Sequence, residues 1–257
     1  MADPLHQFKI EKIVDLPDIT LPVVGHVDLA ITNSHVAMTV AFAAIVLFLT
    51  AVTSNAQVVP GRLQTVGEGI FGLIDNLTDS IIGHEGRKLF PFVFTVFTLI
   101  LGMNFLGLML AFTATSQIAV TATFGVLTIG LVLIIGFAKH GLGFFKLFVP
   151  SGVPWVLLPV IILIEFASFL LRPVTLTLRL FGNMMGGHVA LKVFAGFVAA
   201  AVIGQIGLLG IPVGILSIGM VTALTALEFL VAFLQAFVFA VLTCIYLNDV
   251  VNLGHGH

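Results

Sequence analysis

Charged side chains are scarce in this chain. Only 9% of its 257 residues are Asp, Glu, Lys or Arg, whereas 59% are hydrophobic, and the formal net charge is −2. A water-soluble domain of this size could not cover so many apolar side chains with polar surface. The chain also has no cluster of Lys and Arg that would bind nucleic acid. The composition therefore indicates an integral membrane protein that has no nucleic-acid partner.

Other features are absent as well. Cys244 is the only cysteine, which excludes an internal disulfide. Alternation of apolar and polar residues with period two is missing, which disfavours a membrane β-barrel. No nucleophile elbow or phosphate-binding loop occurs. We therefore expect no cofactor, no metal site and no ATP chemistry in this chain.

Long charge-free runs predict the membrane spans. About 20 apolar residues cross a hydrocarbon core as a helix, so the runs hold five or six crossings. They are Val36–Val52, Leu89–Ala138, Leu147–Ile164, Val193–Leu227 and Phe229–Asn248.

These runs predict one membrane domain over residues 1–257. It begins with a polar arm, residues 1–34. Residues 35–157 hold span one (His35–Val52), an amphipathic helix on the membrane surface (Leu63–Ile82), and a hairpin of two spans (Phe90–Phe112 and Ala119–Ala138). The predicted fold is an all-α membrane protein with these elements and a long helical hairpin over residues 158–250.

The last two helical segments exceed a bilayer in length. Leu158–Ile203 and Pro212–Leu247 would be ~70 and ~50 Å long, against a hydrocarbon core of ~30 Å. They must either break or tilt steeply, and Gly204–Gly214 is the expected turn between them. The residues that could interrupt the first segment are Pro173, Gly182, Gly186 and Gly187.

Lys and Arg predict the orientation, because cytoplasmic loops carry their excess. Arg62, Arg87 and Lys88 follow span one, and Lys139 and Lys146 follow span three. The link Thr113–Ile118 has none. We expect the N-terminus outside and the C-terminus in the cytoplasm.

A polar stripe runs along the first long helix. Its members fall within about 80° of one another on a continuous helix. A guanidinium near a bilayer centre costs ~2.5 to ~17 kcal/mol, so Arg179 must face a partner or water. The stripe is either a path for charge or a buried ion-pair network that fixes helix packing. Its residues are Glu165, Ser168, Arg172, Thr175, Arg179 and Asn183.

Five further residues attract attention. Glu228 and Gln235 are seven residues apart and share a face of the last helix, and His188 is the natural partner of Glu228 in a proton relay. His188 alone would more often serve packing. Lys192 fits a side chain that reaches for the membrane interface. Asn104 fits an interhelical hydrogen bond, although a place on the path stays open.

Two motifs carry a family resemblance. LRLFGNMMGGH (Leu178–His188) and LEFLVAFLQAFVFAVLTCIYL (Leu227–Leu247) resemble subunit a of F-type ATP synthases, and the order of elements agrees across nearly the whole chain. In many bacterial members of this family, a carboxylate stands at the position of His188 and a histidine at that of Glu228. Here the two are exchanged, and in this respect the chain resembles alphaproteobacterial and mitochondrial relatives.

The resemblance implies a stator subunit of a proton-translocating rotary ATP synthase. Its partners would be protons, the lipid bilayer, the c ring and the b subunits of the peripheral stalk. Two proton half-channels would lie against the ring, with Arg179 as the essential arginine between them. The implied proton-path residues are Arg179, His188, Glu228, Gln235, Asn183 and Glu165, with Arg172, Ser168, Thr175 and Asn104 as further candidates. The absence of a transit peptide favours a bacterial inner membrane.

Two alternatives remain. A secondary transporter could use Arg179 to bind an anionic substrate, but it should show repeated halves and discontinuous helices, and neither is evident. An intramembrane enzyme would need a nucleophile and base pair, and none is apparent. The test between these alternatives and the stator subunit is whether the chain purifies alone or together with a c ring and a peripheral stalk.

Overall fold

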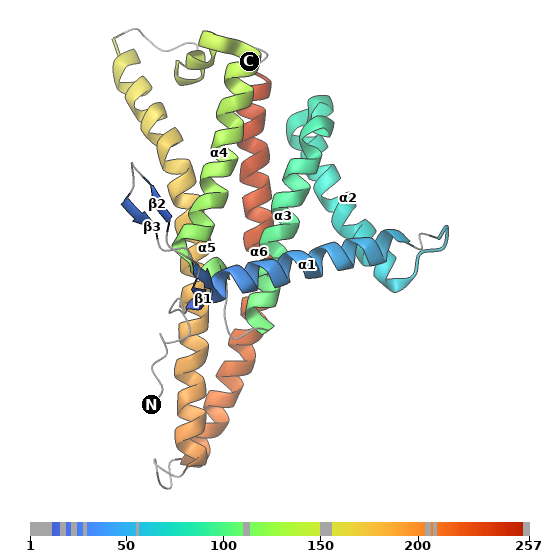
Figure 1. Ribbon diagram of the computed structural model, residues 1–257, viewed down its shortest axis with the longest axis vertical. Helices are drawn as coiled ribbons and strands as arrows, with labels where there is room; N and C mark the ends of the chain where they lie inside the picture. The colour runs from blue at the N-terminus through green and yellow to red at the C-terminus, as the bar shows by residue number, and fades with distance from the viewer. Residues whose placement is uncertain are drawn as a thin grey trace.

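The computed structural model describes residues 12–15, 19–21, 25–27, 30–54, 57–109, 114–149, 156–203, 207 and 210–253. Parts of the predicted polar arm, of the link at 113–118 and of the turn at 204–214 lie outside these residues. Six α-helices occur in the described part, with short 3₁₀ segments between some of them (Figure 1). The α-helices are α1 (Asn33–Ser54), α2 (Arg62–Ile82), α3 (Gly86–Met109), α4 (Ile118–His140), α5 (Leu158–Val202) and α6 (Gly210–Val251).

Five of the helices are long and apolar enough to cross a membrane. They are α1, α3, α4 with the start of the following 3₁₀ segment η4 (Gly141–Phe148), α5 and α6. This confirms the predicted all-α membrane fold and the number of spans. The N-terminal arm departs from the prediction, because it contains four short strands. β1 (Lys12–Asp15) pairs with β4 (Ala30–Thr32), and β2 (Ile19–Leu21) pairs with β3 (Gly25–Val27), both antiparallel.

Helix α2 is amphipathic, as its sequence predicts. Its buried positions, Gly67, Ile74, Thr78 and Ile82, recur at helical spacing, and α2 packs against α1, α3 and α6. Glu68, Asp75 and Asp79 are exposed. The apolar face is only partly covered within this chain, since Leu63 and Val66 are exposed.

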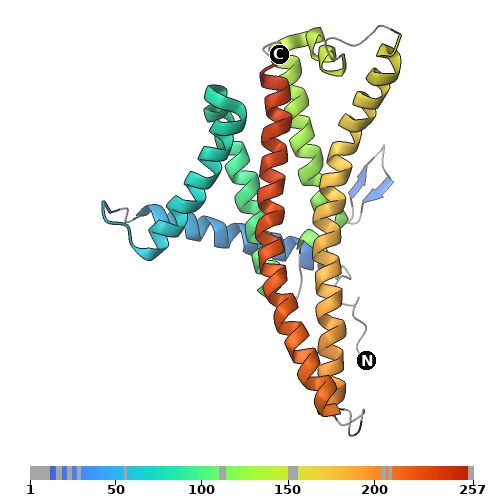
Figure 2. The same cartoon turned by 180° about the vertical axis from the view of Figure 1, so that it is seen from behind.

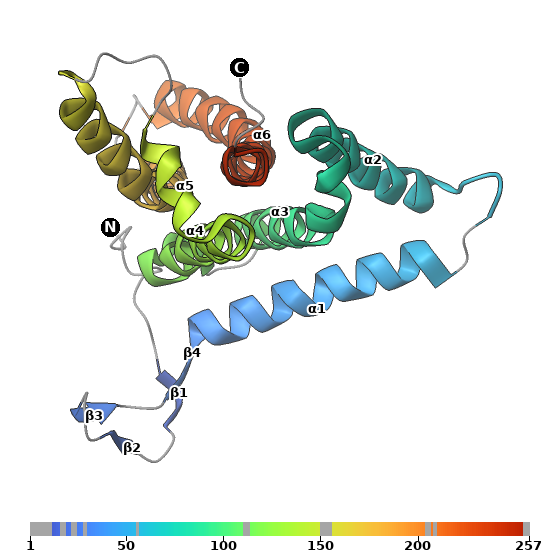
Figure 3. The same cartoon turned by 90° about the horizontal axis from the view of Figure 1, so that it is seen from above.

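Two glycines let α1 approach its neighbours closely. A Cβ atom on Gly67 of α2 would lie 2.6 Å from Val52 Cγ1, and one on Gly102 of α3 would lie 2.7 Å from Ile45 Cγ1. Any larger residue would push α1 away from this part of the bundle. Helix α1 lies across the direction of α6, which Figure 3 shows end-on while α1 is seen lengthwise.

The long hairpin is formed by two unbroken helices. Helix α5 has 45 residues and α6 has 42, lengths of about 67 and 63 Å. They lie side by side in antiparallel directions (Figure 2). Helix α5 continues through Pro173 and through the glycines at 182, 186 and 187, so the alternative of a break is wrong. Since a hydrocarbon core is only about 30 Å thick, both helices must be strongly tilted in a membrane.

The far end of the hairpin differs slightly from the predicted turn. Gly207 has a φ of 61°, which favours glycine. Helix α6 begins at Gly210, so the end of the predicted turn is helical instead. A Cβ atom on Gly214 would lie 3.2 Å from Ala201 Cβ. Small residues on both sides therefore let the two helices meet near the turn.

The opposite end of the molecule gathers the junction of α2 and α3, the segment after α4 and the end of α6 (Figure 1). Lys139 Nζ lies 3.0 Å from a carboxylate oxygen of Glu85, and Lys88 Nζ lies 3.6 Å from the other. His140 Nε2 lies 3.0 Å from the Val250 carbonyl oxygen. The ends of α2, α4 and α6 therefore meet at one end of the bundle.

Candidate functional site

The polar stripe of α5 lies on one continuous helix face. Because α5 is unbroken, the predicted set from Glu165 to Asn183 keeps its helical register. Glu165 and Arg172 are half-buried, whereas Ser168, Thr175, Arg179 and Asn183 are exposed. The structure thus presents much of the stripe at the surface of this chain.

Arg179 is an exposed cation on an apolar helix. It makes no ion pair within the described part of the chain. Leu180, the next residue, is fully buried and anchors this turn of α5 in the core. The guanidinium is therefore held on a rigid helix and is open to a group outside the chain, as an intramembrane cation requires.

Asn183 and Gln235 connect the two long helices. The Asn183 side-chain amide donates to the Gln235 side-chain oxygen over 2.9 Å. Gln235 is buried, and its Nε2 group has no acceptor among the described residues. This pairing was not predicted from the sequence. The hydrogen bond therefore ties α5 to α6 one helical turn beyond Arg179.

The Glu228 carboxyl group lies against the backbone of α5. A Cβ atom on Gly187 would contact Glu228 Oε1 and would lie 2.9 Å from its carboxyl carbon. Both carboxyl oxygens are buried without a hydrogen-bond partner in the described part of the molecule. His188 is half-buried and follows Gly187 directly. The structure thus brings Glu228 to the level of His188, its expected partner in a proton relay.

Arg172 has partners inside the chain. Its Nη1 lies 3.1 Å from Asp249 Oδ2, and its guanidinium lies over the Tyr246 ring at 4.7 Å and near the Phe169 ring at 5.7 Å. Ion pairing and stacking of this kind fix helix packing. The ion-pair alternative thus describes this part of the stripe better than a charge path.

Asp249 and Tyr246, the partners of Arg172, were not predicted from the sequence. Asp249 is the only acid or base other than histidine after Glu228, and Tyr246 is the only tyrosine of the chain. That rarity was the available signal. Neither residue could be paired with Arg172 before the register of the hairpin was known.

Asn104 has the interhelical hydrogen bond that its isolation suggested. Its amide nitrogen donates to the Ala232 carbonyl oxygen over 3.3 Å. It is fully buried between α3 and α6, away from the exposed stripe of α5. Among the described residues no group of three or more His, Cys, Asp or Glu gathers, so no residue is assigned to a metal.

Comparison with known proteins agrees with this arrangement. Residues 35–248 match the family described as ATP synthase A chain. The chain is 50% identical over 256 residues to ATP synthase subunit a of Rhizobium etli (strain CIAT 652), covering 99% of each. It is 48% identical to the subunit a of Chelativorans sp. (strain BNC1), covering 99% of each. It is also 48% identical to that of Rhodopseudomonas palustris (strain BisA53), covering 99% of this chain and all of the relative.

These relatives support neither a secondary transporter nor an intramembrane enzyme. The five apolar helices and the shared family describe a multi-pass protein of the inner membrane. The chain belongs to the ATP synthase subunit a family, the proton-translocating stator component of the Fo membrane sector.

Proposed function

We propose that Arg179 separates two proton half-channels between this chain and a c ring. Its exposure on α5 without an ion pair in the described part of the chain is the observation that carries this proposal. A guanidinium stays protonated, so Arg179 cannot conduct by losing its own proton. It favours an ionised carboxylate on the ring and thereby promotes proton release beside it.

His188, Glu228, Asn183 and Gln235 form the relay on one side of Arg179. Glu228 supports this role because its buried carboxyl oxygens lack partners among the described residues. A proton arriving from outside binds at this pair and passes to a ring carboxylate. The neutralised carboxyl group then rotates into lipid, where a charged form would be costly. Gln235 holds the exposed Asn183 side chain in place through the hydrogen bond between them.

Glu165 extends the polar face in the other direction. It lies two turns before Arg172 on α5, with Ser168 and Thr175 exposed on the same stripe. These three residues line the second half-channel in this scheme. Arg172 and Asn104 are assigned to packing, since each has a partner in a neighbouring helix.

The proposed orientation has the N-terminus outside and the C-terminus in the cytoplasm. Five spans put the two ends of the chain on opposite sides. The contact between Lys139 and Glu85 supports one shared side for the two basic loops. Cysteines at the exposed positions Glu68 and Asp75 should react with an impermeant thiol reagent from the cytoplasmic side. Labelling from outside would reverse the orientation.

The substitution Arg179→Ala tests the proposal. The complex with its c ring and b subunits should still assemble, but proton-driven ATP synthesis in inverted vesicles should be abolished. Lys192→Ala is the matched control, because Lys192 is another exposed cation of α5 and lies outside the proposed path. Normal synthesis by the Arg179→Ala complex would reject the assigned role.

A further inference from the structure

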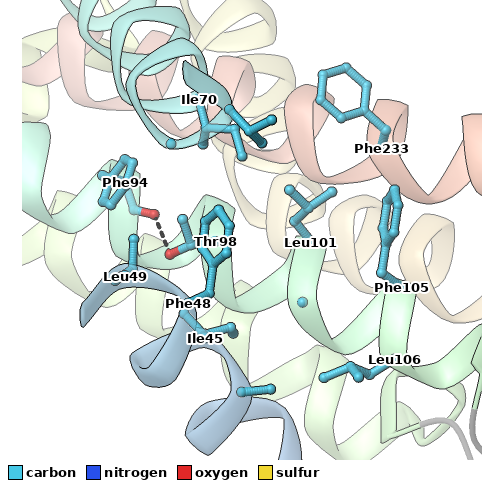
Figure 4. A pocket seen from close by; sticks show the side chains of 14 residues that line it. Ile45, Phe48, Leu49, Ile70, Phe94, Thr98, Leu101, Phe105, Leu106 and Phe233 are labelled. Atoms are coloured by element: carbon cyan, nitrogen blue, oxygen red, sulfur yellow. Dashed lines mark hydrogen bonds between the residues drawn. The ribbon is translucent and has the colours of Figure 1, made fainter. Parts of the chain in front are cut away.

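An apolar crevice lies between α1, α2, α3 and α6, away from the polar stripe. It has a volume of about 520 Å³, within the range of about 300–1,000 Å³ typical of ligand sites. Figure 4 shows Ile45 and Phe48 of α1, Ile70 of α2, and Phe94 and Leu101 of α3 around it.

The lining offers a ligand almost no polar contact. Thr98 carries the one side-chain hydroxyl of the lining, and that hydroxyl donates to the Phe94 carbonyl oxygen over 2.8 Å. The crevice therefore suits a hydrocarbon chain, which has no hydrogen-bonding group to satisfy. Gly67 and Gly102 also line it, and they set how closely α1 approaches α2 and α3.

A positive charge stands near the crevice, just before its lining residues on α2. Arg62 lies one helical turn before Val66, which lines the crevice, and so stands near the same face of α2. It is exposed and makes no ion pair with any described residue. The nearest acid on α2, Glu68, lies nearly opposite Val66 around the helix and accepts a hydrogen bond from Gln64 over 2.7 Å.

The connection before Arg62 fits the depth of lipid headgroups. It follows directly on the membrane span α1, which ends at Ser54. Val58 and Val59 in this connection are almost fully exposed, at 102% and 80%. Two bare valines beside an arginine suit the boundary between hydrocarbon and headgroups, where apolar side chains point inward and cations reach outward.

We propose that this crevice binds one anionic phospholipid. An acyl chain lies between α1, α2 and α3, and the phosphate pairs with Arg62. The lipid fills the gap beneath α1 and fastens this lightly packed helix to the bundle. Only 11% of the most apolar 18 residues of α1 are buried within the chain.

Photo-crosslinking of the assembled complex tests the site. The probe is a phosphatidylglycerol that carries a diazirine in one acyl chain, in phosphatidylcholine vesicles. We expect adducts on residues of the crevice, located by mass spectrometry. Ala44→Phe, which fills the crevice, should remove them. Ala43→Phe is the matched control, because Ala43 is exposed on α1 and does not line the crevice.

A second pair of variants tests the headgroup without disturbing packing. Arg62→Gln should lower phosphatidylglycerol labelling about fivefold, since one cation near an anionic surface contributes about this much. Labelling by the zwitterionic phosphatidylcholine analogue should not change. Arg87→Gln, at another exposed arginine, should leave both signals intact. The proposal is overturned if crevice residues cross-link to another protein subunit, or if Arg62→Gln and Arg87→Gln behave alike.

Discussion

Gly187 of α5 lies directly against the carboxyl group of Glu228 in α6. No other residue type fits there unless Glu228 moves. Gly187→Ala should therefore displace the carboxyl group by about the size of a methyl group. A misplacement of order 1 Å at a reacting group can cost up to about 100-fold, so we expect proton-driven ATP synthesis to fall about 10- to 100-fold. ATP synthesis in inverted vesicles is the measurement.

Gly186→Ala is the control for this substitution. A Cβ atom at Gly186 would meet nothing within 4 Å. The two variants change helix propensity equally, so a difference between them reports the contact with Glu228. Equal rates would show that the position of Glu228 does not limit the reaction.

His188 and Glu228 should behave as one unit. Each single change, His188→Glu or Glu228→His, leaves two like groups at the same level of the hairpin and should reduce proton pumping strongly. The exchange variant that combines them restores one acid and one imidazole, and should recover much of the loss. Proton pumping by the three complexes is the measurement. Additive losses would mean that the two residues work independently.

Arg172 and Asp249 should contribute to stability rather than to transport. Both side chains are mostly buried, and Arg172→Ala leaves Asp249 unpaired. A loss of about 1–3 kcal/mol is expected for a hydrogen-bonded ion pair of this kind. Exchanging the charges, by Arg172→Asp with Asp249→Arg, should restore part of it. Thermal unfolding of the purified complex measures the effect, and unchanged stability with lost pumping would place Arg172 in the proton path instead.

Glu85 should make the stability of the fold depend on pH in the acidic range. Its hydrogen bond with Lys139, followed by the charges of Lys139 and Lys88, holds the pKa of Glu85 below its ordinary value of 4.5. A carboxyl group with a lowered pKa stabilises the fold above 4.5, and the contribution disappears as the pH falls from 4.5 through the lowered value.

The matching measurement compares wild type with Glu85→Gln in detergent. The difference in thermal stability should be small, because the pair is exposed. It should be constant near neutral pH and should disappear once Glu85 is protonated. A difference that grows as the pH falls would contradict this sign.

Most of the helices could be predicted from hydrophobic periodicity and from the charge-free runs, because a bilayer sets the length of each apolar run that crosses it. The same patterns predicted the unbroken stripe from Glu165 to Asn183 only as one of two alternatives. Helix-breaking residues such as Pro173 have local preferences, and packing of α5 against α4 and α6 overrides them. The partners of Arg172 were hidden for a related reason: they depend on the register between α5 and α6, which only the folded hairpin defines.

The strands of the N-terminal arm and the apolar crevice were also beyond sequence reasoning. The strands are three or four residues long, too short for a clear alternating pattern. The crevice depends on how three consecutive helices and the distant α6 pack together, and its width depends on two glycines that look unremarkable in sequence.

Because the long hairpin is steeply tilted, each residue along it accounts for only a small part of the membrane voltage. If the 45 residues of α5 share a core of about 30 Å, each residue advances only about 0.7 Å in depth. Arg172 and His188 are sixteen residues apart, yet they then differ in depth by only about 11 Å. One charge that crosses the whole membrane gains about 2.3 kcal/mol per 100 mV. At 100 mV, a charge that moves by one residue along α5 therefore gains about 0.05 kcal/mol. Protons that move between neighbouring side chains of this helix therefore meet many small electrical steps rather than one large one.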